Sequence, residues 1–406
     1  MKILFVCKKF PYPPKDGESI AILQMSQALA QKGCEVSLLA MNTKRHPFKH
    51  LEPLPSELSH FQVIEDVMVD NSINWYGAFK NLFSSQSYHI SRFISQEFED
   101  KLKSMILSNE YDIIQLETLY LAPYIDAIKA VTQSPVVMRA HNIEHEIWER
   151  ISENIRFIPK KVYVQYLSNK LKRFEIQKLN QYDLLVAITD RDLEMFRAMG
   201  YKNGCISSPV GYKVGYYEID TNSFAKPLKL SFIGSLDWLP NLQGLEWFLS
   251  EVWPKILERF PKTEFHFAGR NAPKSLVGKT YPNVFYHGEV ENSTAFVQKY
   301  PLFIVPLRAG SGLRIKILEA MSSGRIVISS TIGLEGIAAQ DKKHVFYADD
   351  SADYIKALEY CFQHPEELPN IASSARAFIQ NNFDRDVLAE RLMSAYQKAL
   401  TETPHE

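Results

Sequence analysis

Short apolar runs alternate with longer amphipathic stretches along the first half of the chain. The runs at 3–6 and 184–188 are apolar throughout, which is typical of parallel strands that helices cover on both faces. The pattern predicts strands at 2–7, 35–41, 111–117, 135–140 and 182–188, and helices at 19–32, 119–131 and 190–199. This order of elements indicates a doubly wound α/β domain.

The same alternation starts again after a turn-rich passage at 207–227. It predicts strands at 228–233, 263–268, 284–287, 302–305 and 326–329, and helices at 242–259, 293–299 and 313–323. We therefore expect an α/β protein with two Rossmann-like doubly wound domains, at 1–208 and 209–383. A final amphipathic helix at 384–406 is expected to pack back toward the N-terminal domain.

Charge and composition limit the partners. Lys plus Arg total 46 and Asp plus Glu total 47, so the net charge of the 406 residues is -1. Nucleic acid is therefore not an expected partner, and an anionic ligand has to be held by a local site. The first apolar run stops before Lys8 and is too short for a secretion signal. No later run reaches the ~18 apolar residues of a membrane span. The four cysteines show no metal-ligand spacing. We expect a cytoplasmic protein without disulfides, metal or cofactor.

The passage at 305–324 is the richest in candidate chemistry. A strand leads into three small residues, two cations and a carboxylate: Gly310, Ser311, Gly312, Arg314, Lys316 and Glu319. A helix that starts after such a loop offers free N–H donors and a positive dipole end to a phosphate. Cations in the first helical turn oppose that dipole unless an anion offsets them. The passage therefore predicts a diphosphate site, and the alternative is an amphipathic helix with solvated charges.

Several motifs together resemble those of one enzyme family. They are Gly312-x-x-x-Lys316-x-x-Glu319-Ala320-Met321-x-x-Gly324, Gly333-x-Glu335-Gly336, Arg139-Ala-His141-Asn142, Phe232-Ile-Gly234-Ser235, Phe267-Ala-Gly269, Tyr286-His-Gly288 and Trp238-x-Pro240-Asn241. The chain resembles retaining GT-B glycosyltransferases of family 4 (glycosyltransferase group 1), including those of bacterial surface polysaccharide assembly. This resemblance implies two domains that face each other across a cleft, with the acceptor bound by the first and a nucleotide sugar by the second.

The resemblance also implies roles for single residues. Glu319 matches the second acidic residue of the family signature, which binds the ribose of the donor and belongs to the catalytic site, while Ser311 replaces the first acidic residue. The family's basic pair after the first strand of the second domain is absent here, so Arg314 and Lys316 are expected to neutralise the diphosphate. The glycine loop residue Gly17 is a further diphosphate contact, and Arg308 is a second choice. Four more residues are expected to contact the nucleotide: Gly234, Gly269, Arg270 and His287.

In the first domain, His141 directly follows the predicted strand at 135–140. It resembles the family's active-site histidine, and its structural alternative is a histidine at a helix cap. Asn142 and Glu117 are expected on the acceptor or sugar side. The sequence from His141 to His145 also fits the H-x-x-E-H pattern of inverted zinc proteases, which leaves a zinc hydrolase as a remote alternative.

The segment 156–173 carries six basic residues and no acidic residue, with aromatic and aliphatic residues between them. A solvated helix face is one interpretation. Peripheral contact with the inner face of an anionic membrane, or with a lipid-diphosphate acceptor, is the other.

Together these features predict a hexosyltransferase-type glycosyltransferase. It would move a sugar from a nucleotide diphosphate sugar to a glycan or lipid-linked acceptor, with retention, in bacterial polysaccharide synthesis. The main alternative is a protein that binds nucleotide sugars without transferring them. A dinucleotide oxidoreductase is disfavoured, because no G-x-G-x-x-G follows the first strand.

Overall fold

The computed structural model describes residues 1–14, 17–44, 47–48, 53–72, 81, 87–153, 155, 157–211, 219–224, 228–309 and 313–402. The chain forms two compact units. Unit 1 comprises Met1–Gly211 and Leu388–Glu406, and unit 2 comprises Tyr212–Val387. Among the described helices, none combines the length and the apolar composition that crossing a bilayer requires.

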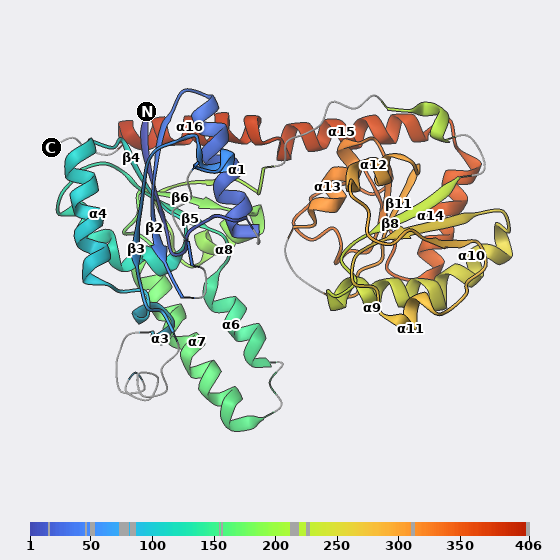
Figure 1. The fold of residues 1–406 in the computed structure, drawn as a ribbon, viewed down its shortest axis with the longest axis horizontal. Coiled ribbons are helices and arrows are strands. Elements are labelled where there is room, and N and C mark those ends of the chain that lie inside the picture. Colours follow the sequence, from blue (N-terminus) through green and yellow to red (C-terminus); the bar gives the residue numbers. More distant parts are fainter. Residues whose placement is uncertain are drawn as a thin grey trace. The chain divides into compact units, whose positions relative to one another are not determined.

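Unit 1 is built on a parallel sheet whose described strands lie in the order β3-β2-β1-β4-β5-β6-β7 (Figure 1). The strands are β1 (Lys2–Cys7), β2 (Glu35–Asn42), β3 (Phe61–Met68), β4 (Ile113–Leu116), β5 (Val136–Ala140), β6 (Leu184–Ala187) and β7 (Gly204–Ser207). The strand order reverses between β1 and β4. The carboxyl ends of these two strands therefore flank the position where doubly wound folds bind ligands.

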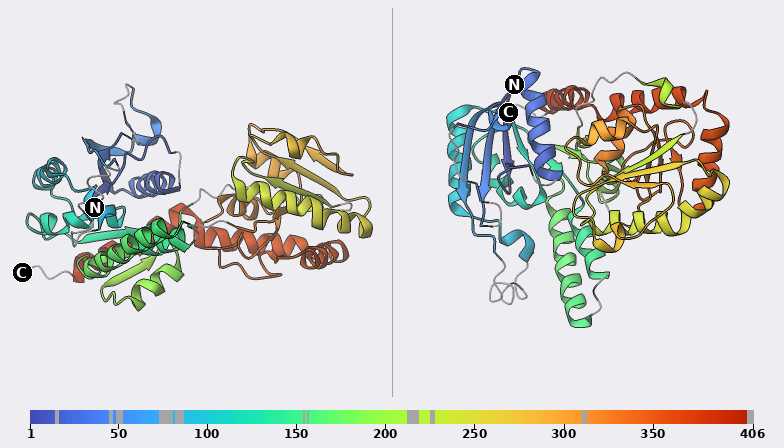
Figure 2. Two further views of the ribbon diagram at one scale, coloured as in Figure 1. Left: turned by 90° about the horizontal axis from the view of Figure 1, so that it is seen from below. Right: turned by 45° about the vertical axis from the view of Figure 1, so that its right-hand side comes forward.

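Helices cover both faces of this sheet. They are α1 (Gly17–Gln31), α3 (Tyr88–Ser91), α4 (Gln96–Asn109), α5 (Ile125–Lys129), α6 (Glu144–Glu153), α7 (Ile158–Lys178), α8 (Asp190–Ala198) and α16 (Arg385–Glu402), with the 3-10 segments η1 (Ser56–Leu58) and η2 (Leu119–Tyr124). Ile3 and Phe5 of β1 pack in one core with α1 and α16, whereas Leu4 and Val6 pack in another with α4 and α5. The paired helices α6 and α7 extend away from the sheet as a hairpin (Figure 1; Figure 2, right).

Unit 2 repeats this plan, with its described strands in the order β10-β9-β8-β11-β12-β13. The strands are β8 (Lys229–Ile233), β9 (Glu264–Ala268), β10 (Val284–Tyr286), β11 (Leu302–Val305), β12 (Ile326–Ser329) and β13 (Phe346–Tyr347). The helices are α9 (Leu239–Trp247), α10 (Trp253–Arg259), α11 (Lys274–Val277), α12 (Ser293–Gln298), α13 (Ile315–Ser322), α14 (Ser351–Gln363) and α15 (Leu368–Phe383), with η3 (Thr221–Phe224) and the π-helical η4 (Phe248–Val252). Here the order reverses between β8 and β11, and two buried clusters again cover the two faces of the sheet. Both units are doubly wound, as the apolar runs predicted.

Two predicted helices have a different form. The stretch 119–131 begins as the 3-10 segment η2 and becomes α-helical only at α5; Pro123 within η2 lacks the N–H that an α-helix needs. The helix expected from residue 313 begins at Ile315, with Arg314 as its N-cap. A third predicted helix, at 242–259, is divided into α9, the π-helical η4 and α10. These differences are local and leave the order of the predicted strands and helices unchanged.

Candidate functional site

The start of α13 lies at the carboxyl edge of the unit 2 sheet, beside the point where the strand order reverses. Gly310, Ser311 and Gly312, which the sequence predicts as a phosphate loop, lie outside the described residues. Arg314 is the N-cap of α13 and Lys316 lies in its first turn. Both cations thus lie at the positive end of the helix dipole, as predicted.

Lys316 is held by polar groups and an aromatic ring. Its Nζ donates to Oδ1 of Asn241 at 2.9 Å and to the carbonyl oxygen of Ile233 at 3.4 Å. The same atom lies 4.5 Å from the ring centroid of Phe232. Burial, with an added contribution from the charge of Arg314, lowers the pKa of Lys316 to about 7. A bound anion would restore the charged form, so this position favours an anion site.

Arg314 is also buried, with 7% of its surface exposed. Its Cζ lies 5.5 Å from the ring centroid of Trp238 at the start of α9. Burial lowers the pKa of Arg314, although the charge of Glu335 opposes that shift. Two cations that are costly to bury therefore lie together at one helix end.

Glu319 lies one turn beyond Lys316 on α13 and is 9% exposed. Its Oε1 accepts hydrogen bonds from the hydroxyls of Ser293, at 3.2 Å, and Thr294, both at the start of α12. In the described residues no hydrogen bond involves Oε2 of Glu319. One carboxylate oxygen is therefore fixed while the other can accept from the hydroxyl groups of a ligand.

Gly234 directly follows β8 and Gly269 directly follows β9, and other atoms lie close to the position of a Cβ at each. A Cβ at position 269 would lie 2.0 Å from the carbonyl oxygen of Gly234, and a Cβ at position 234 would lie 2.7 Å from Nδ2 of Asn241. Since Asn241 accepts from Lys316, Gly234 controls where that cation lies. Contact of either glycine with a nucleotide stays a prediction.

The other predicted nucleotide contacts have partners of their own. Nε of Arg270 donates to the hydroxyl of Ser235 at 2.9 Å, and Nε2 of His287 lies 3.0 Å from Nδ1 of His266. Cζ of Arg308 lies 4.7 Å from the ring centroid of Trp247. In the described residues, the structure joins none of these three by a hydrogen bond to the group on α13.

In unit 1, the ends of β4 and β5 bring Glu117 and His141 together. Nε2 of His141 lies 3.0 Å from Oε2 of Glu117. Burial alone raises the pKa of Glu117, but the Arg139 guanidinium 3.7 Å away and the bonds from His141 and Gln115 lower it below its ordinary value overall. Because Glu117 has no exposed surface, it lies behind His141 and orients the imidazole, instead of facing an acceptor as the sequence predicted.

A chain of buried side chains continues from this pair to the C-terminal helix. Nε2 of Gln115 donates to Oε1 of Glu117 at 2.5 Å, and Oε1 of Gln115 accepts from the hydroxyl of Tyr396 on α16. Arg139 is fully buried and donates through Nη1 to a carbonyl oxygen of α1 at 3.3 Å. The position of His141 thus depends on three elements of unit 1: β4, β5 and α16.

Other residues of interest lie at the same carboxyl edge of the unit 1 sheet as His141. Gly17, the first residue of α1, and Asn142 are both exposed, so both are accessible to a ligand. The hydroxyl of Tyr120 donates to Oε2 of Glu144 at 2.9 Å, and Nζ of Lys8 lies 4.6 Å from the Tyr120 ring centroid. Burial raises the pKa of Glu144 above its ordinary value, although Lys8 and Tyr120 oppose that shift. Lys8, Tyr120 and Glu144 follow β1, β4 and β5, so they belong to the same carboxyl edge of the sheet as His141.

The structure separates the two histidines of the H-x-x-E-H pattern. Helix α6 begins at Glu144, so His141 precedes the helix. Nδ1 of His145 lies 2.6 Å from Oε2 of Glu175 on α7, whereas His141 pairs with Glu117. Among the described residues, the group with spacing suited to a metal is His364, Glu366 and Glu367.

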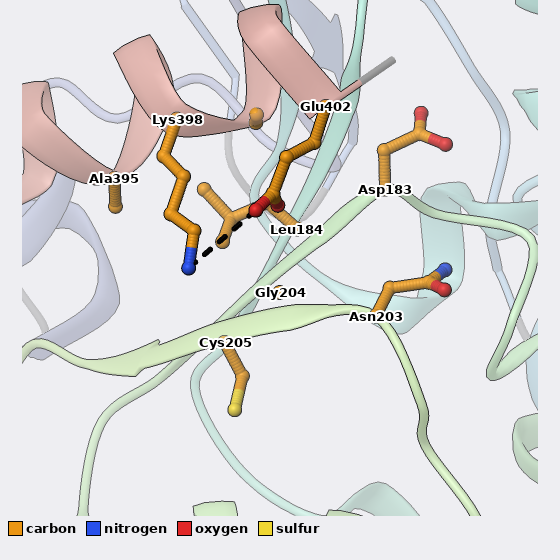
Figure 3. Close-up of a pocket in the computed structure, with 9 residues that line it drawn as sticks. Asp183, Leu184, Asn203, Gly204, Cys205, Ala395, Lys398 and Glu402 are labelled. Carbon is orange, nitrogen blue, oxygen red and sulfur yellow. Dashed lines mark ion pairs between the residues drawn. The ribbon is translucent and has the colours of Figure 1, made fainter. Parts of the chain in front are cut away.

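A pocket of about 270 Å³ lies at the opposite, amino edge of the unit 1 sheet (Figure 3). Asp183 and Asn203, which precede β6 and β7, line it on one side, and Lys398 and Glu402 of α16 line it on the other. The latter two form an ion pair at 3.5 Å. The pocket is smaller than the ~300–1,000 Å³ typical of ligand sites and lies away from the carboxyl edge, so we assign it no ligand.

Sequence reasoning missed the residues that support the site. Asn241 lies in the Trp238-x-Pro240-Asn241 motif and Arg139 in the Arg139-Ala-His141-Asn142 motif. The position of Arg139 inside an apolar strand was a signal that could have indicated a buried charge pair. Thr294 and Gln115 carry no such local signal. Tyr396 lies 281 residues from its partner, which no local pattern could indicate.

Comparisons with known proteins agree with this architecture. Residues 227–364 match the family model described as glycosyl transferases group 1. A Klebsiella pneumoniae relative, named "Uncharacterized 44.6 kDa protein in cps region", is 23% identical over 94% of this chain and 96% of its own length.

Two solved structures are similar over nearly the whole chain. Anabaena HepE in complex with UDP has a TM-score of 0.65 and 14% identity, and it covers 98% of this chain and 100% of its own. Sucrose-phosphate synthase from Thermosynechococcus elongatus has a TM-score of 0.64 and 13% identity, and it covers 99% of this chain and 100% of its own. The protein therefore has the GT-B fold, and the part of unit 2 that carries α13 matches the glycosyl transferases group 1 model.

Proposed function

We propose that this protein is a glycosyltransferase that uses a nucleoside diphosphate sugar bound at the start of α13. The observation that carries the proposal is the group formed by Arg314, Lys316 and Glu319: a buried and a half-buried cation, and a carboxylate with one oxygen that accepts no hydrogen bond in the described residues. The group lies at the strand-order reversal of a unit that matches the glycosyl transferases group 1 model. The solved complexes of Anabaena HepE with UDP and UDP-glucose support this class of donor.

The chemistry of transfer explains the cations. As the bond to the sugar breaks, negative charge grows on the departing diphosphate, and preorganised charges that match it lower the barrier. Each charge-assisted hydrogen bond from Arg314 or Lys316 contributes about 1.5–3 kcal/mol. Since these residues supply the positive charge, the proposal includes no metal, and we expect transfer to continue in the presence of EDTA.

Unit 1 supplies His141, which would position the sugar or the acceptor, and Glu117 orients it. The acceptor would be a glycan or a lipid-linked sugar, a proposal that the name of the Klebsiella relative from a cps region supports. Transfer of a hexose with retention is the finer expectation, and the anomeric proton of the product would test it by NMR.

A protein that binds nucleotide sugars without transfer is the second candidate. Ser311 favours it, because the family's first acidic residue is replaced there. Release or transfer of sugar from a bound donor would exclude this candidate, and donor binding without product for any acceptor would favour it.

Glu319→Ala is expected to weaken binding of the nucleotide sugar about 10- to 100-fold, because the ribose hydroxyls lose a charged acceptor. The measurement is thermal unfolding against a panel of UDP, GDP and ADP compounds, in which a ligand at 100 times its Kd stabilises the protein by about 2.7 kcal/mol. Glu366→Ala removes an exposed carboxylate of the same unit and is expected to leave the shift unchanged. A panel without any stabilising compound contradicts the proposal.

Alanine substitutions at Gly234 and Gly269 are expected to affect protein stability and donor binding to different extents. Gly269→Ala is expected to cost about 1–3 kcal/mol of unfolding free energy, because the new methyl group meets backbone. Gly234→Ala meets the movable end of Asn241 and is expected to cost less stability but to weaken donor binding through Lys316. Chemical denaturation and donor titration measure the two effects. Equal loss of affinity in both variants would show that Gly234 has no special link to the cation.

A further inference from the structure

Helix α7 of unit 1 presents an exposed stripe that its packing in the unit does not explain. The stripe consists of Ile158, Val162, Tyr166, Asn169, Arg173 and Ile176, which recur at intervals of three or four residues and so lie on one side of the helix. Ile158 is 72% exposed and Val162 is 61% exposed, and Phe157, just before the helix, is 67% exposed. These are large apolar groups at the free end of the α6–α7 hairpin (Figure 1; Figure 2, right).

The other side of α7 accounts for its contacts within the unit. Val164, Leu167 and Leu171 are buried, and Glu175 accepts from the backbone N–H groups at the start of α6. Nζ of Lys170 donates to the carbonyl oxygen of Asn81 at 2.6 Å. The hairpin is therefore anchored through one side of α7, and the apolar side chains of the exposed stripe on the other side take no part in these contacts.

The positive charges beside the stripe indicate which kind of partner it binds. Lys172 and Arg173 are exposed and Lys161 is half-buried, and at helical spacing all three lie in or beside the stripe. The sequence has no acidic residue between Phe157 and Phe174. An apolar stripe bordered by cations matches a surface with negative headgroups above an apolar layer. An acidic protein could pair with the cations. It would not supply an apolar layer into which the exposed side chains at the end of the hairpin could insert.

We propose that the exposed stripe of α7 docks on an anionic lipid bilayer, with Phe157 and Ile158 inserted below the headgroups and the cations at phosphate level. The bilayer is the partner, and the interaction is peripheral, since the helix lies along the surface. This proposal does not depend on the donor site of unit 2, so either can fail alone. It does place a lipid-linked acceptor within reach of unit 1.

Vesicle flotation of the full chain tests the proposal. Vesicles of phosphatidylcholine with 30% phosphatidylglycerol (about one lipid in three) are expected to carry the protein, and vesicles of phosphatidylcholine alone are not. Val162→Ser is expected to lower the bound fraction severalfold. Lys161→Glu with Lys172→Glu is expected to lower it at least tenfold, since each cation near such a surface contributes about 1 kcal/mol, or roughly fivefold.

Matched controls exclude general effects. Leu107→Ser removes a side chain of unit 1 that is 67% exposed on α4, and Lys262→Glu reverses an exposed charge of unit 2; both are expected to float like the unmodified chain. All variants change exposed or half-buried side chains, and unchanged thermal unfolding would confirm that they fold. Equal flotation with neutral vesicles, no flotation with either kind, or a Val162→Ser variant that binds like its parent would each overturn the proposal.

Discussion

Lys316→Met is expected to weaken binding of the nucleotide sugar about 10- to 100-fold and, at the same time, to stabilise the free protein. The affinity falls because one charge-assisted contact to the diphosphate is lost. The stability rises, by about 1 kcal/mol, because methionine fills a similar volume without the cost of burying a charge. Donor titration and chemical denaturation of the same variant measure the two opposite effects.

The pH dependence has a definite sign. The pKa of Lys316 is lowered to about 7 in the free protein, so above pH 7 the donor must bind together with a proton. Affinity is expected to fall as the pH rises from 7 to 9, by at most tenfold per unit, and Lys316→Met should flatten this slope. Because the unfolded chain keeps its proton to higher pH, the stabilising effect of Lys316→Met should be largest below pH 7 and decline above it.

Lys274→Met is the control, since Lys274 is an exposed lysine of α11 in the same unit. It is expected to change neither affinity nor its pH dependence. A Lys316→Met variant that loses stability while it keeps full affinity would show that the buried cation is structural.

His141→Ala is expected to lower kcat about 100-fold while donor affinity stays within twofold, because loss of a group that positions the reacting atoms costs about that factor. The imidazole belongs to unit 1, whereas the proposed donor contacts lie on α13 of unit 2. Steady-state transfer rates and donor titration separate the two parameters.

The residues behind His141 should act through its position. Glu117→Gln keeps the shape of the side chain but removes the charge that orients the imidazole, so kcat is expected to fall while affinity for the donor remains. Tyr396→Phe removes the bond to Gln115 at the far end of the same chain and should lower kcat less. A pH–rate profile that shifts in both variants would support positioning, and unchanged profiles and rates would show that this network only stabilises the unit.

The strands that position both sites were predictable because burial on two faces leaves a simple pattern. The run 302–305 is apolar at every position and the run 326–329 is apolar up to its last residue, Ser329, and the observed strands have the same bounds. Strand β3, at the edge of its sheet, was missed because its sequence FQVIEDVM mixes polar and apolar residues without the strict alternation or the continuous apolar run that indicates a strand. Helix α4 was missed as well, although Ser95 caps it as in ordinary helices.

Candidate residues for the site could be identified in the sequence where a residue conflicts with its local surroundings. Arg314 and Lys316 oppose a helix dipole, and that conflict identified them before any contact was known. The residues that contact Arg314 and Lys316 do not conflict with their own local surroundings, so the sequence gave no signal for them. Asn241 lies 75 residues from Lys316, so the bond between them exists only because β8 and β11 are neighbours in the sheet.

A crystal structure of the protein with the nucleotide sugar that stabilises it most tests the central claim directly. The diphosphate is expected within hydrogen-bond distance of Nζ of Lys316 and the guanidinium of Arg314, and the ribose hydroxyls at Oε2 of Glu319. A donor that occupies another part of the chain, or that leaves these three side chains without contact, would contradict it.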